Sequence, residues 1–417
     1  MRPRAFAWRA ASSESREPGR AGAIGESSWM NSKETEDRYI LPTYNNIRFP
    51  LSFVRSEGSY VEDDTGRRYL DLYGGHAVCV LGHCHPKWVE ALSEQAATFD
   101  FYSNLCYCPV RAEAAKLVVE RCYSMHQAFF CNSGAEANET ALKIARKATG
   151  REYVVSMEED FHGRTIGALS VTGFEKSRAL FPQNIAQWTR FLRLGDLAAL
   201  EALDPDEIAA VIIEPLQSVV GVKMAEVSYY LGLRQWCDRN GVVLIFDEVQ
   251  TGNGRTGKWF VGEHWGLEPD LVTTAKGLGG GYPVGAVLAN EKLSATVEPG
   301  DQATTFGGGP MAAAAVAATY RIIEEEGLVE QVAELSAGVI ERLGEYADRG
   351  IEEVRGLGYL LGVRCERPAK EIQGALLERN ILVGTSGDPQ TFRLLPPLTV
   401  SAEEWEIFFA ALEDIFT

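Results

Sequence analysis

Two reactive side chains, an acid and an amine, stand at the ends of two apolar runs in this sequence. Asp247 ends the run Val243-Leu-Ile-Phe-Asp247, and Lys276 lies 29 residues further on, just after the run Leu271-Val-Thr-Thr274. The β-branched and aromatic residues of both runs favour strands. In an open α/β sheet, ligands bind beyond the carboxyl ends of the strands, so both groups are expected to face one ligand site.

A carboxylate and a primary amine in one crevice suit an aldehyde cofactor that carries a basic ring nitrogen. The amine of Lys276 would form a Schiff base with the aldehyde, and Asp247 would hold the ring nitrogen in its protonated form. Pyridoxal phosphate is the cofactor with this chemistry. Taken alone, each residue is equally compatible with a plainer role, a helix cap for Asp247 and a solvated surface amine for Lys276.

A turn at Asn132-Ser133-Gly134 separates an apolar run, 128–131, from a strong helix-forming stretch that begins at Ala135. Unpaired backbone N–H groups at such a helix start bind a phosphate with the help of the helix dipole, and Ser133 adds a hydroxyl. The turn lacks both the Gly-Lys-Ser/Thr of a P-loop and the glycine pattern of a dinucleotide site. It predicts a site for one phosphate, with a capped helix that binds no ligand as the alternative.

Two further segments suit a planar ligand that is rich in oxygen. Phe161 stands two residues before Gly163, and an aromatic ring beside a glycine can lie flat on a heteroaromatic ring. Thr304 and Thr305 bring hydroxyl groups to a second glycine-rich cluster. Taken alone, the first is equally a core phenylalanine and the second a flexible loop.

The elements that must position these groups alternate along the middle of the chain. Between about 86 and 300, strand-like runs alternate with amphipathic helical stretches, which is typical of a mostly parallel sheet with helices on both faces. After Pro310, two helices (312–326 and 328–346), short strand-like runs and a terminal helix (402–415) indicate a smaller α+β domain. The clearest strands expected are Ala128–Cys131, Tyr153–Ser156, Ala209–Glu214, Val242–Asp247, Leu271–Thr274 and Val284–Ala289.

Four segments make up the predicted domain organisation. Residues 1–29 hold five arginines and three glutamates, a net charge of +2, without hydrophobic periodicity. We expect them to be disordered, either as an organelle-targeting presequence or, as we favour, as translated sequence ahead of a start at Met30. Residues 30–80 are expected to join the small domain, 81–310 to form the large cofactor-binding domain, and 311–417 to form the small C-terminal domain.

Composition excludes several classes of function. The net charge of -18 disfavours a nucleic-acid binder and large acidic partners, which leaves a small-molecule substrate. No apolar run approaches the roughly 18 residues that a membrane span needs. The eight cysteines form no repeated framework, which favours a reducing cytoplasm, and His83-Cys84-His85 lacks a second ligand pair, so we expect no metal site.

Six motifs occur in the order that is typical of one enzyme family. They are Asn132-Ser-Gly-Ala-Glu-Ala-Asn138, Phe161-His-Gly-Arg-Thr165, Glu214-Pro-Leu-Gln217, Asp247-Glu-Val-Gln-Thr-Gly252, Ala275-Lys-Gly277 and Thr304-Thr-Phe-Gly-Gly308. From about Tyr44 to the C-terminus the chain resembles the class III, fold type I pyridoxal-phosphate aminotransferases. Within that family it is most similar to the acylornithine branch, through Gly82-His-Cys-His-Pro86, Tyr102-Ser-Asn104 and Phe392-Arg-Leu-Leu-Pro-Pro-Leu398.

The resemblance implies a homodimer with shared active sites that moves the δ-amino group of N-acetylornithine or N-succinylornithine to 2-oxoglutarate in arginine biosynthesis. Lys276 is then the Schiff-base lysine, Asp247 pairs with the ring nitrogen, and Phe161 stacks on the ring. Thr305 is expected to reach the phosphate bound in the second subunit. The cofactor-binding residues implied are Ser133, Gly134, Ala135, Phe161, Asp247, Glu248, Val249, Gln250, Lys276 and Thr305.

On the substrate side, the resemblance implies that Arg164 and Thr304 contact the acylornithine and that Arg393 binds the α-carboxylate of glutamate and 2-oxoglutarate. One departure concerns Val219, since many family members carry a glutamate there that gates this arginine. The change makes free ornithine and 4-aminobutyrate less suitable donors, although another ω-aminotransferase or a same-fold aminomutase stays an alternative. His76 is expected near the entrance, either as a contact for the acyl or carboxylate group or as a structural histidine.

Overall fold

The computed structural model describes residues 32–44, 48–181 and 183–417, so the leader expected at 1–29 lies outside the described residues. The described chain divides into two compact units, one holding 32–54 and 62–67 and the other holding 55–61 and 68–417. Helix α1 (Ser32–Tyr39) belongs to the first unit. Strands β1 (Phe53–Glu57) and β2 (Tyr60–Asp63) each run across a boundary between the units.

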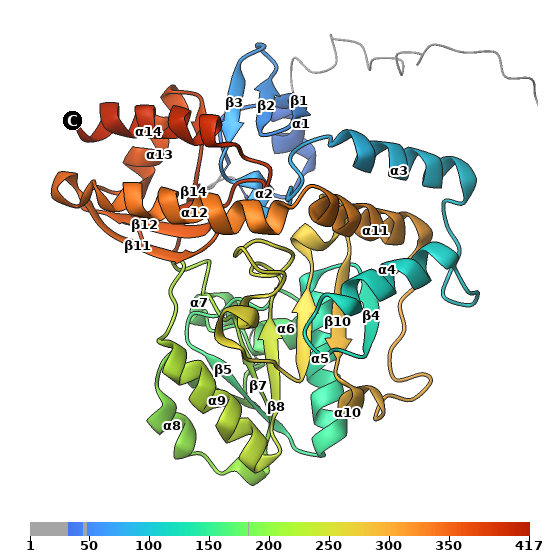
Figure 1. The fold of residues 1–417 in the computed structure, drawn as a ribbon. Helices are drawn as coiled ribbons and strands as arrows, with labels where there is room; N and C mark the ends of the chain where they lie inside the picture. The colour runs from blue at the N-terminus through green and yellow to red at the C-terminus, as the bar shows by residue number, and fades with distance from the viewer. Residues whose placement is uncertain (1–31, 45–47, 182) are drawn as a thin grey trace, which may run out of the picture. The chain divides into compact units, whose positions relative to one another are not determined.

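The second unit is built on a sheet of seven strands (Figure 1). These are β4 (Gln127–Cys131), β5 (Tyr153–Met157), β6 (Thr189–Leu192), β7 (Ile208–Ile213), β8 (Val243–Asp247), β9 (Leu271–Thr274) and β10 (Gly285–Ala289). Their order is β4-β10-β9-β8-β7-β5-β6, and neighbouring strands from β9 to β6 are parallel. Strand β10 alone points the opposite way, antiparallel to both of its neighbours, β9 and β4. The predicted mostly parallel α/β sheet is confirmed, and all six predicted strands are present.

The inner strands of the sheet are continuous apolar runs in the sequence. Strand β7 is an example, since all six of its residues are buried. Ala210 and Ile212 pack on one face with helix α5 (Gly134–Thr149). Val211 and Ile213 pack on the other face with α9 (Val227–Asn240). A strand covered on both faces needs no polar alternation. This sandwich fixes the strand ends that carry the site.

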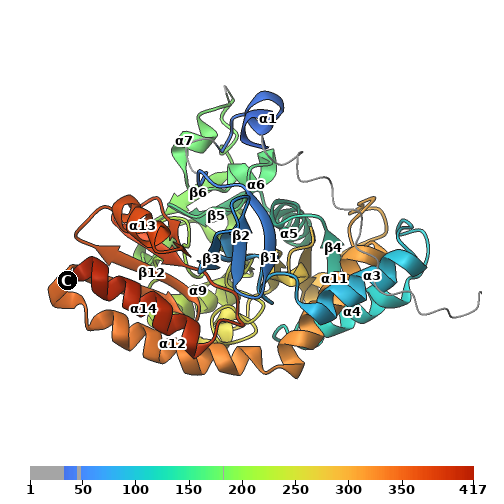
Figure 2. The same cartoon turned by 90° about the horizontal axis from the view of Figure 1, so that it is seen from above.

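The remaining helices surround the sheet and the C-terminal part. They are α2 (Gly74–Ala77), α3 (Pro86–Thr98), α4 (Pro109–Glu120), α6 (Ile166–Ser170), α7 (Glu175–Arg178), α8 (Leu197–Glu201), α10 (Glu291–Ser294), α11 (Pro310–Glu325), α12 (Leu328–Gly344), α13 (Ala369–Glu378) and α14 (Ala402–Phe416). Figures 1 and 2 show α3, α4 and α11 side by side. Across the described ranges, no helix combines the length and apolarity that a bilayer span requires.

The C-terminal part forms a separate sheet of four antiparallel strands in the order β11-β12-β15-β14. Its strands are β11 (Ile351–Leu357), β12 (Leu360–Cys365), β14 (Gly384–Thr385) and β15 (Thr391–Leu394). Strand β13 (Ile381–Leu382) pairs instead with β3 (Arg68–Asp71) in parallel. Helix α14 begins with the predicted capping box, in which Ser401 and Glu404 each accept the other's backbone N–H. The sequence patterns missed β6 and β11.

Candidate active site

Five strands of the large sheet end at one edge, and the predicted site residues follow those ends. Because β4 is antiparallel to β10, which is itself antiparallel to β9, β4 points the same way as β5, β7, β8 and β9. The carboxyl ends of these strands are the ligand-binding edge of an open α/β sheet. The residues delivered there are Ser133 after β4, Phe161 after β5, Glu214 after β7, Asp247 at the end of β8 and Lys276 after β9.

Asp247 is a buried carboxylate that is held by three donors. Its Oδ2 accepts from Asn138 Nδ2 at 2.7 Å and lies 2.8 Å from His162 Nδ1, and its Oδ1 accepts from the N–H of Val249 at 3.1 Å. Only 4% of the residue is exposed. These contacts fix the carboxylate in place, which is what a partner for a ring nitrogen requires.

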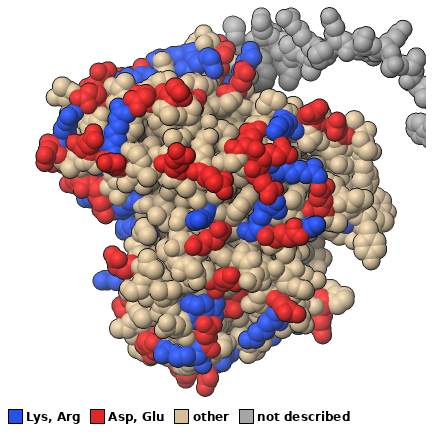
Figure 3. All heavy atoms as spheres, in the orientation of Figure 1, with Lys and Arg blue, Asp and Glu red and all other residues tan. Residues whose placement is uncertain are grey.

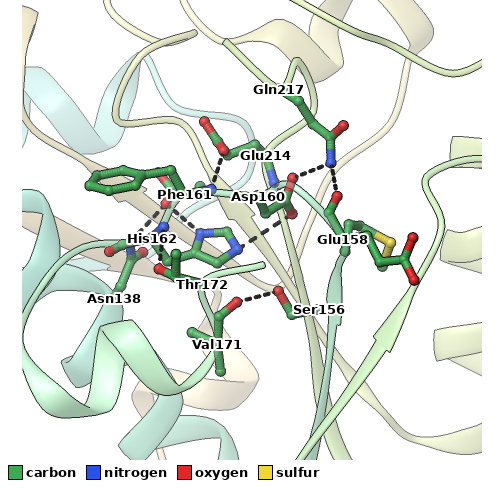
Figure 4. Close-up of polar contacts among 12 residues, drawn as sticks. Asn138, Ser156, Glu158, Asp160, Phe161, His162, Val171, Thr172, Glu214 and Gln217 are labelled. Carbon is green, nitrogen blue, oxygen red and sulfur yellow. Dashed lines mark hydrogen bonds and ion pairs between the residues drawn. The ribbon is translucent and has the colours of Figure 1, made fainter. Parts of the chain in front are cut away.

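His162 joins Asp247 to a second buried acid, Asp160. Its Nε2 lies 3.4 Å from Asp160 Oδ2 (Figure 4). All three side chains are buried. Burial disfavours the imidazolium, but the negatively charged partners Asp160 and Asp247 outweigh this and raise the pKa of His162 to about 10. The cation between the two acids therefore persists at neutral pH. We call these three residues the Asp160–His162–Asp247 relay.

The relay continues toward β7 through polar contacts of Asp160. Its Oδ1 accepts from Gln217 Nε2 at 2.8 Å and its Oδ2 accepts from the N–H of Glu214 at 3.0 Å (Figure 4). Glu214 in turn accepts the N–H of Phe161 at 2.5 Å. Burial, reinforced by the charges of Asp160 and Asp247, raises the pKa of Glu214 well above its ordinary value. Phe161 is thereby anchored through its backbone, which leaves its ring free to pack on a ligand.

Lys276 opens the short turn that follows β9 and has a left-handed φ of 45°. In the described chain its amine has neither a hydrogen bond nor an ion pair. Burial lowers its pKa, and the charges of Asp247 and Glu214 oppose that shift only in part. A buried amine with a lowered pKa is neutral for more of the time, and the neutral amine is the nucleophilic and proton-accepting form.

The predicted phosphate turn forms the start of α5. Ser133 is the N-cap, and its hydroxyl accepts from the N–H of Glu136 at 3.3 Å, so its own proton is available to a ligand. The backbone N–H groups of Gly134 and Ala135 have no acceptor among the described residues. A Cβ on Gly134 would lie 2.8 Å from the side chain of Val249, so only glycine allows this close packing. The turn retains the unpaired donors that a phosphate site needs.

Gly163 supports the phosphate turn from behind, which gives a test of the site. It has a φ of +136°, and an added Cβ would lie 2.7 Å from the Cβ of Ala135. We expect Gly163→Ala to cost about 1–3 kcal/mol of unfolding free energy through overpacking and to weaken cofactor binding by displacing Ala135. Gly150→Ala is the matched control, because its φ is +69° but its Cβ would meet nothing within 4 Å.

The measurements for this pair are urea unfolding and titration of the cofactor-free protein with pyridoxal phosphate. Gly150→Ala should lose only the backbone cost of a left-handed residue, about 1–2 kcal/mol, and should bind the cofactor normally. Equal cofactor affinity in both variants would rule out a supporting role for Gly163.

Arg393 on β15 is buried, with 6% exposed, yet its bonds go to neutral oxygens alone. Its Nε donates to the carbonyl of Thr385 at 2.9 Å, and its Nη2 donates to the hydroxyl of Tyr73 at 2.9 Å. Its Nη1 donates to the hydroxyl of Ser218 at 3.2 Å. No carboxylate pairs with it within the described ranges. Burial lowers the pKa of Arg393, and a substrate carboxylate would relieve the cost of keeping the charge there.

Two further predicted cofactor residues, Gln250 and Glu248, form hydrogen bonds with different partners. Gln250 donates from Nε2 to the carbonyl of His76 at 3.3 Å. Glu248 is fully buried, and its carboxylate accepts from Tyr123, from Thr251 and from the N–H of Val261, which leaves only its backbone for a cofactor contact.

The remaining predicted substrate residues, Arg164 and Thr304, and the predicted phosphate contact Thr305 are less buried. Arg164 is exposed and its guanidinium lies 5.5 Å from the ring centre of Phe161. Thr304 accepts a bond from Asn132 Nδ2 at 3.3 Å, so it braces the phosphate turn of its own chain. Thr305 is exposed and makes no hydrogen bond among the described residues. Its expected role in a second subunit stays a prediction.

The adjacent motif His83-Cys84-His85 has its histidines bound to different partners. His83 lies 2.9 Å from a carboxylate oxygen of Asp71, and His85 lies 3.3 Å from one of Glu326. Among the described residues no group of three or more His, Cys, Asp or Glu could hold a metal ion. Each histidine is therefore held by a different carboxylate.

Several residues of the site escaped the sequence patterns. Asp160 follows two glutamates and reads as part of a solvated acidic run. Asn138 did carry a signal, because it lies on the apolar face of α5 beside Ala137 and Ala141, where a lone polar residue needs a partner. Tyr73 lies 320 positions from its partner Arg393, and no local pattern connects them.

The model for the aminotransferase class-III family matches residues 43–416. The chain belongs to the class-III aminotransferase family. The acetylornithine aminotransferase of Methanopyrus kandleri is 44% identical over 389 residues, covering 92% of this chain and 98% of the relative. That of Methanosarcina mazei is 41% identical over 380 residues, covering 91% and 95%. The structure of taurine:2-oxoglutarate aminotransferase from Bifidobacterium kashiwanohense, in complex with pyridoxal phosphate and glutamate, gives a TM-score of 0.85 at 25% identity, covering 91% and 96%.

Class-III aminotransferases use pyridoxal phosphate, and the residues of this chain fit that cofactor. The unpaired N–H groups of Gly134 and Ala135 suit its phosphate. The buried carboxylate of Asp247 suits its ring nitrogen, and the unpartnered amine of Lys276 suits its aldehyde. The donor set therefore matches all three polar ends of the cofactor, and the enzyme is a pyridoxal-phosphate-dependent aminotransferase.

Proposed function

We propose that this enzyme transfers the δ-amino group of N-acetylornithine to 2-oxoglutarate, which yields the acylglutamate semialdehyde and glutamate. The observation that carries the proposal is a pair of guanidinium groups without carboxylate partners in the described chain, Arg393 in the buried site and Arg164 beside Phe161. Both substrates carry carboxylates that suit such groups. The names of the relatives with 44% and 41% identity support the same reaction.

Each residue then has a part in the reaction. Pyridoxal phosphate, when bound, supplies an electron sink for the carbon that carries the amino group. Lys276 Nζ takes a proton from that carbon and returns one, a task that its lowered pKa favours. Asp247, held by the relay, keeps the ring nitrogen protonated. Arg393 orients the α-carboxylate of glutamate, so that its Cα reaches Lys276.

We further propose that the enzyme acts as a homodimer. A cavity of about 990 Å³ lies between the segments 103–115 and 302–307, and Thr305 lines it. Leu105 and Tyr107 also line it, and both are exposed, as is the neighbouring Phe306. Exposed apolar side chains gathered in this way mark an interaction surface. A second copy seated there would bury them and bring Thr305 to the partner's phosphate, as the family resemblance implies.

Substrates of this kind are small, acidic and water-soluble, and we propose a cytoplasmic location. Figure 3 shows acidic and basic side chains intermixed over the face that it draws. The net charge of -18 does not suit a large acidic partner. Substrate carboxylates would instead be recognised one at a time, by Arg393 and Arg164.

A panel of amino donors tests the proposal. With 2-oxoglutarate as acceptor, kcat/KM should be highest for N-acetylornithine or N-succinylornithine. The kcat/KM for ornithine and for 4-aminobutyrate should be at least roughly tenfold lower. Each of these donors lacks a group whose contacts with a matching site contribute about 1–3 kcal/mol. The panel also decides between the acetyl and succinyl donors. Absence of glutamate with both acylornithines would disprove the proposed reaction and favour another ω-amine or a same-fold aminomutase.

A further inference from the structure

The segment after Tyr73 forms a single left-handed helical turn. The four residues of α2 (Gly74–Ala77) have φ values between 53° and 68°. Two of them, His76 and Ala77, are not glycine, and L-residues avoid this region because Cβ crowds the following carbonyl. Strain of this kind persists only where the surroundings hold it, and it gathers at functional sites.

The surroundings of α2 do hold it. Asp71 Oδ1 accepts the N–H groups of Tyr73 and Gly74, both at 2.9 Å, which pins the start of the turn. The carbonyl of His76 accepts from Gln250 Nε2 at 3.3 Å, so the turn rests on the segment that follows Asp247. The strained turn is thus built against the cofactor-binding residues.

The imidazole of His76 projects beside the Arg393 site. Its ring centre lies 4.7 Å from that of Tyr73, whose hydroxyl accepts from Arg393. Neither ring nitrogen has a hydrogen-bond partner in the described chain. His76 is an exposed residue, but partial desolvation of its ring and the positive charges of Arg393 and Lys276 lower its pKa, against the opposing charge of Asp71. An imidazole with free nitrogens therefore lies beside the tyrosine that contacts the carboxylate-binding arginine.

We propose that His76 is a specificity-determining residue that donates a hydrogen bond to the substrate carboxylate held by Arg393. The inference rests on the proposed function, in which glutamate and 2-oxoglutarate present that carboxylate beside the reacting carbon. N-acetylornithine carries a hydrogen in place of that carboxylate and cannot form the bond. His76 therefore favours the glutamate half of the reaction over the acylornithine half.

Binding of glutamate or 2-oxoglutarate also changes the charge around the imidazole of His76. A bound carboxylate offsets the positive charges of Arg393 and Lys276, so the imidazole should gain a proton as the acid binds. Affinity for the acid should therefore increase as the pH falls toward the ordinary pKa of histidine, near 6.5. A structural histidine would show no such coupling.

The test compares His76→Gly with Ala77→Gly in the holoenzyme. Both variants relax the same left-handed turn, but only the first removes the imidazole. The two half-reactions are followed separately through the visible absorbance of the bound cofactor. Binding of glutarate, an unreactive dicarboxylate, is measured by calorimetry in two buffers with different ionisation enthalpies, which reports proton uptake.

We expect His76→Gly to raise the KM for glutamate and 2-oxoglutarate and the Kd for glutarate roughly tenfold, the scale of one charge-assisted hydrogen bond. Proton uptake should disappear, and the acylornithine half-reaction should stay within about twofold. Ala77→Gly should match the wild type. Equal changes in both half-reactions, or none in either, would overturn the inference. If acylornithines prove not to be donors but His76→Gly still weakens glutamate and glutarate binding, the proposed donor is wrong and the role of His76 stands.

Discussion

Replacing Lys276 with alanine should lower kcat by about 10⁴-fold or more, the upper range for loss of a positioned acid–base group. The expectation follows from its place after β9, where its amine has a lowered pKa and no bonded partner among the described residues. No other amine is placed to move a proton at the reacting carbon in the site that we describe. The variant should still fold, because alanine adds no bulk to the turn.

The measurement is steady-state glutamate formation, together with the visible absorbance of the bound cofactor. Lys258→Ala is the control, since Lys258 is an exposed lysine to which no role in the site is assigned, and it should keep wild-type kcat. Thermal unfolding of both variants guards against a folding defect. If Lys276→Ala retained more than about a hundredth of wild-type kcat, the assignment of the proton carrier would fail, since such groups supply about 10²–10⁴.

Replacing Arg393 with lysine should raise the KM for 2-oxoglutarate about 10²-fold, because truncating one partner of a buried charge pair costs about 2–5 kcal/mol. An ammonium keeps the charge but cannot donate two parallel bonds to a planar carboxylate. It also leaves the hydroxyls of Tyr73 and Ser218 without their donor. The KM for N-acetylornithine should change much less, since its reacting carbon carries no carboxylate.

Arg364→Lys provides the matched control on the neighbouring strand β12. Arg364 pairs with Glu352 and Asp388 near the surface and takes no part in the site. Both variants are assayed for the KM of each substrate and for melting temperature. A uniform loss for donor and acceptor in Arg393→Lys would mean that this arginine serves the fold and not the recognition of a carboxylate.

Local patterns predicted the parts of the site that lie on one strand or one turn. The runs that end at Asp247 and Thr274 are apolar because helices cover both faces of the sheet, so their positions could be predicted from the sequence. Ser133 and Ser401 are N-caps that depend on their own neighbours, and both were predictable. Such features need no information from distant parts of the chain.

Contacts between distant segments were beyond local patterns. Asp160 joins Gln217 only because β5 and β7 are adjacent in the sheet. The Tyr73–Arg393 bond depends on the packing of β15 against the turn at α2. Strand β6, a partly exposed edge strand with an arginine in it, lacks the apolar signal of the inner strands. Contacts between residues that are distant in the sequence determine these features, and local secondary-structure propensity does not.

The Asp160–His162–Asp247 relay has a consequence for how activity varies with acidity. The pKa of His162 is raised to about 10, so its proton stays in place from weakly acidic to weakly alkaline solution. The acid that faces the cofactor ring thus has an unchanging electrostatic environment over the physiological range. A bell-shaped pH–rate curve should then report the amine of Lys276 and the imidazole of His76, and neither of its limbs should come from His162.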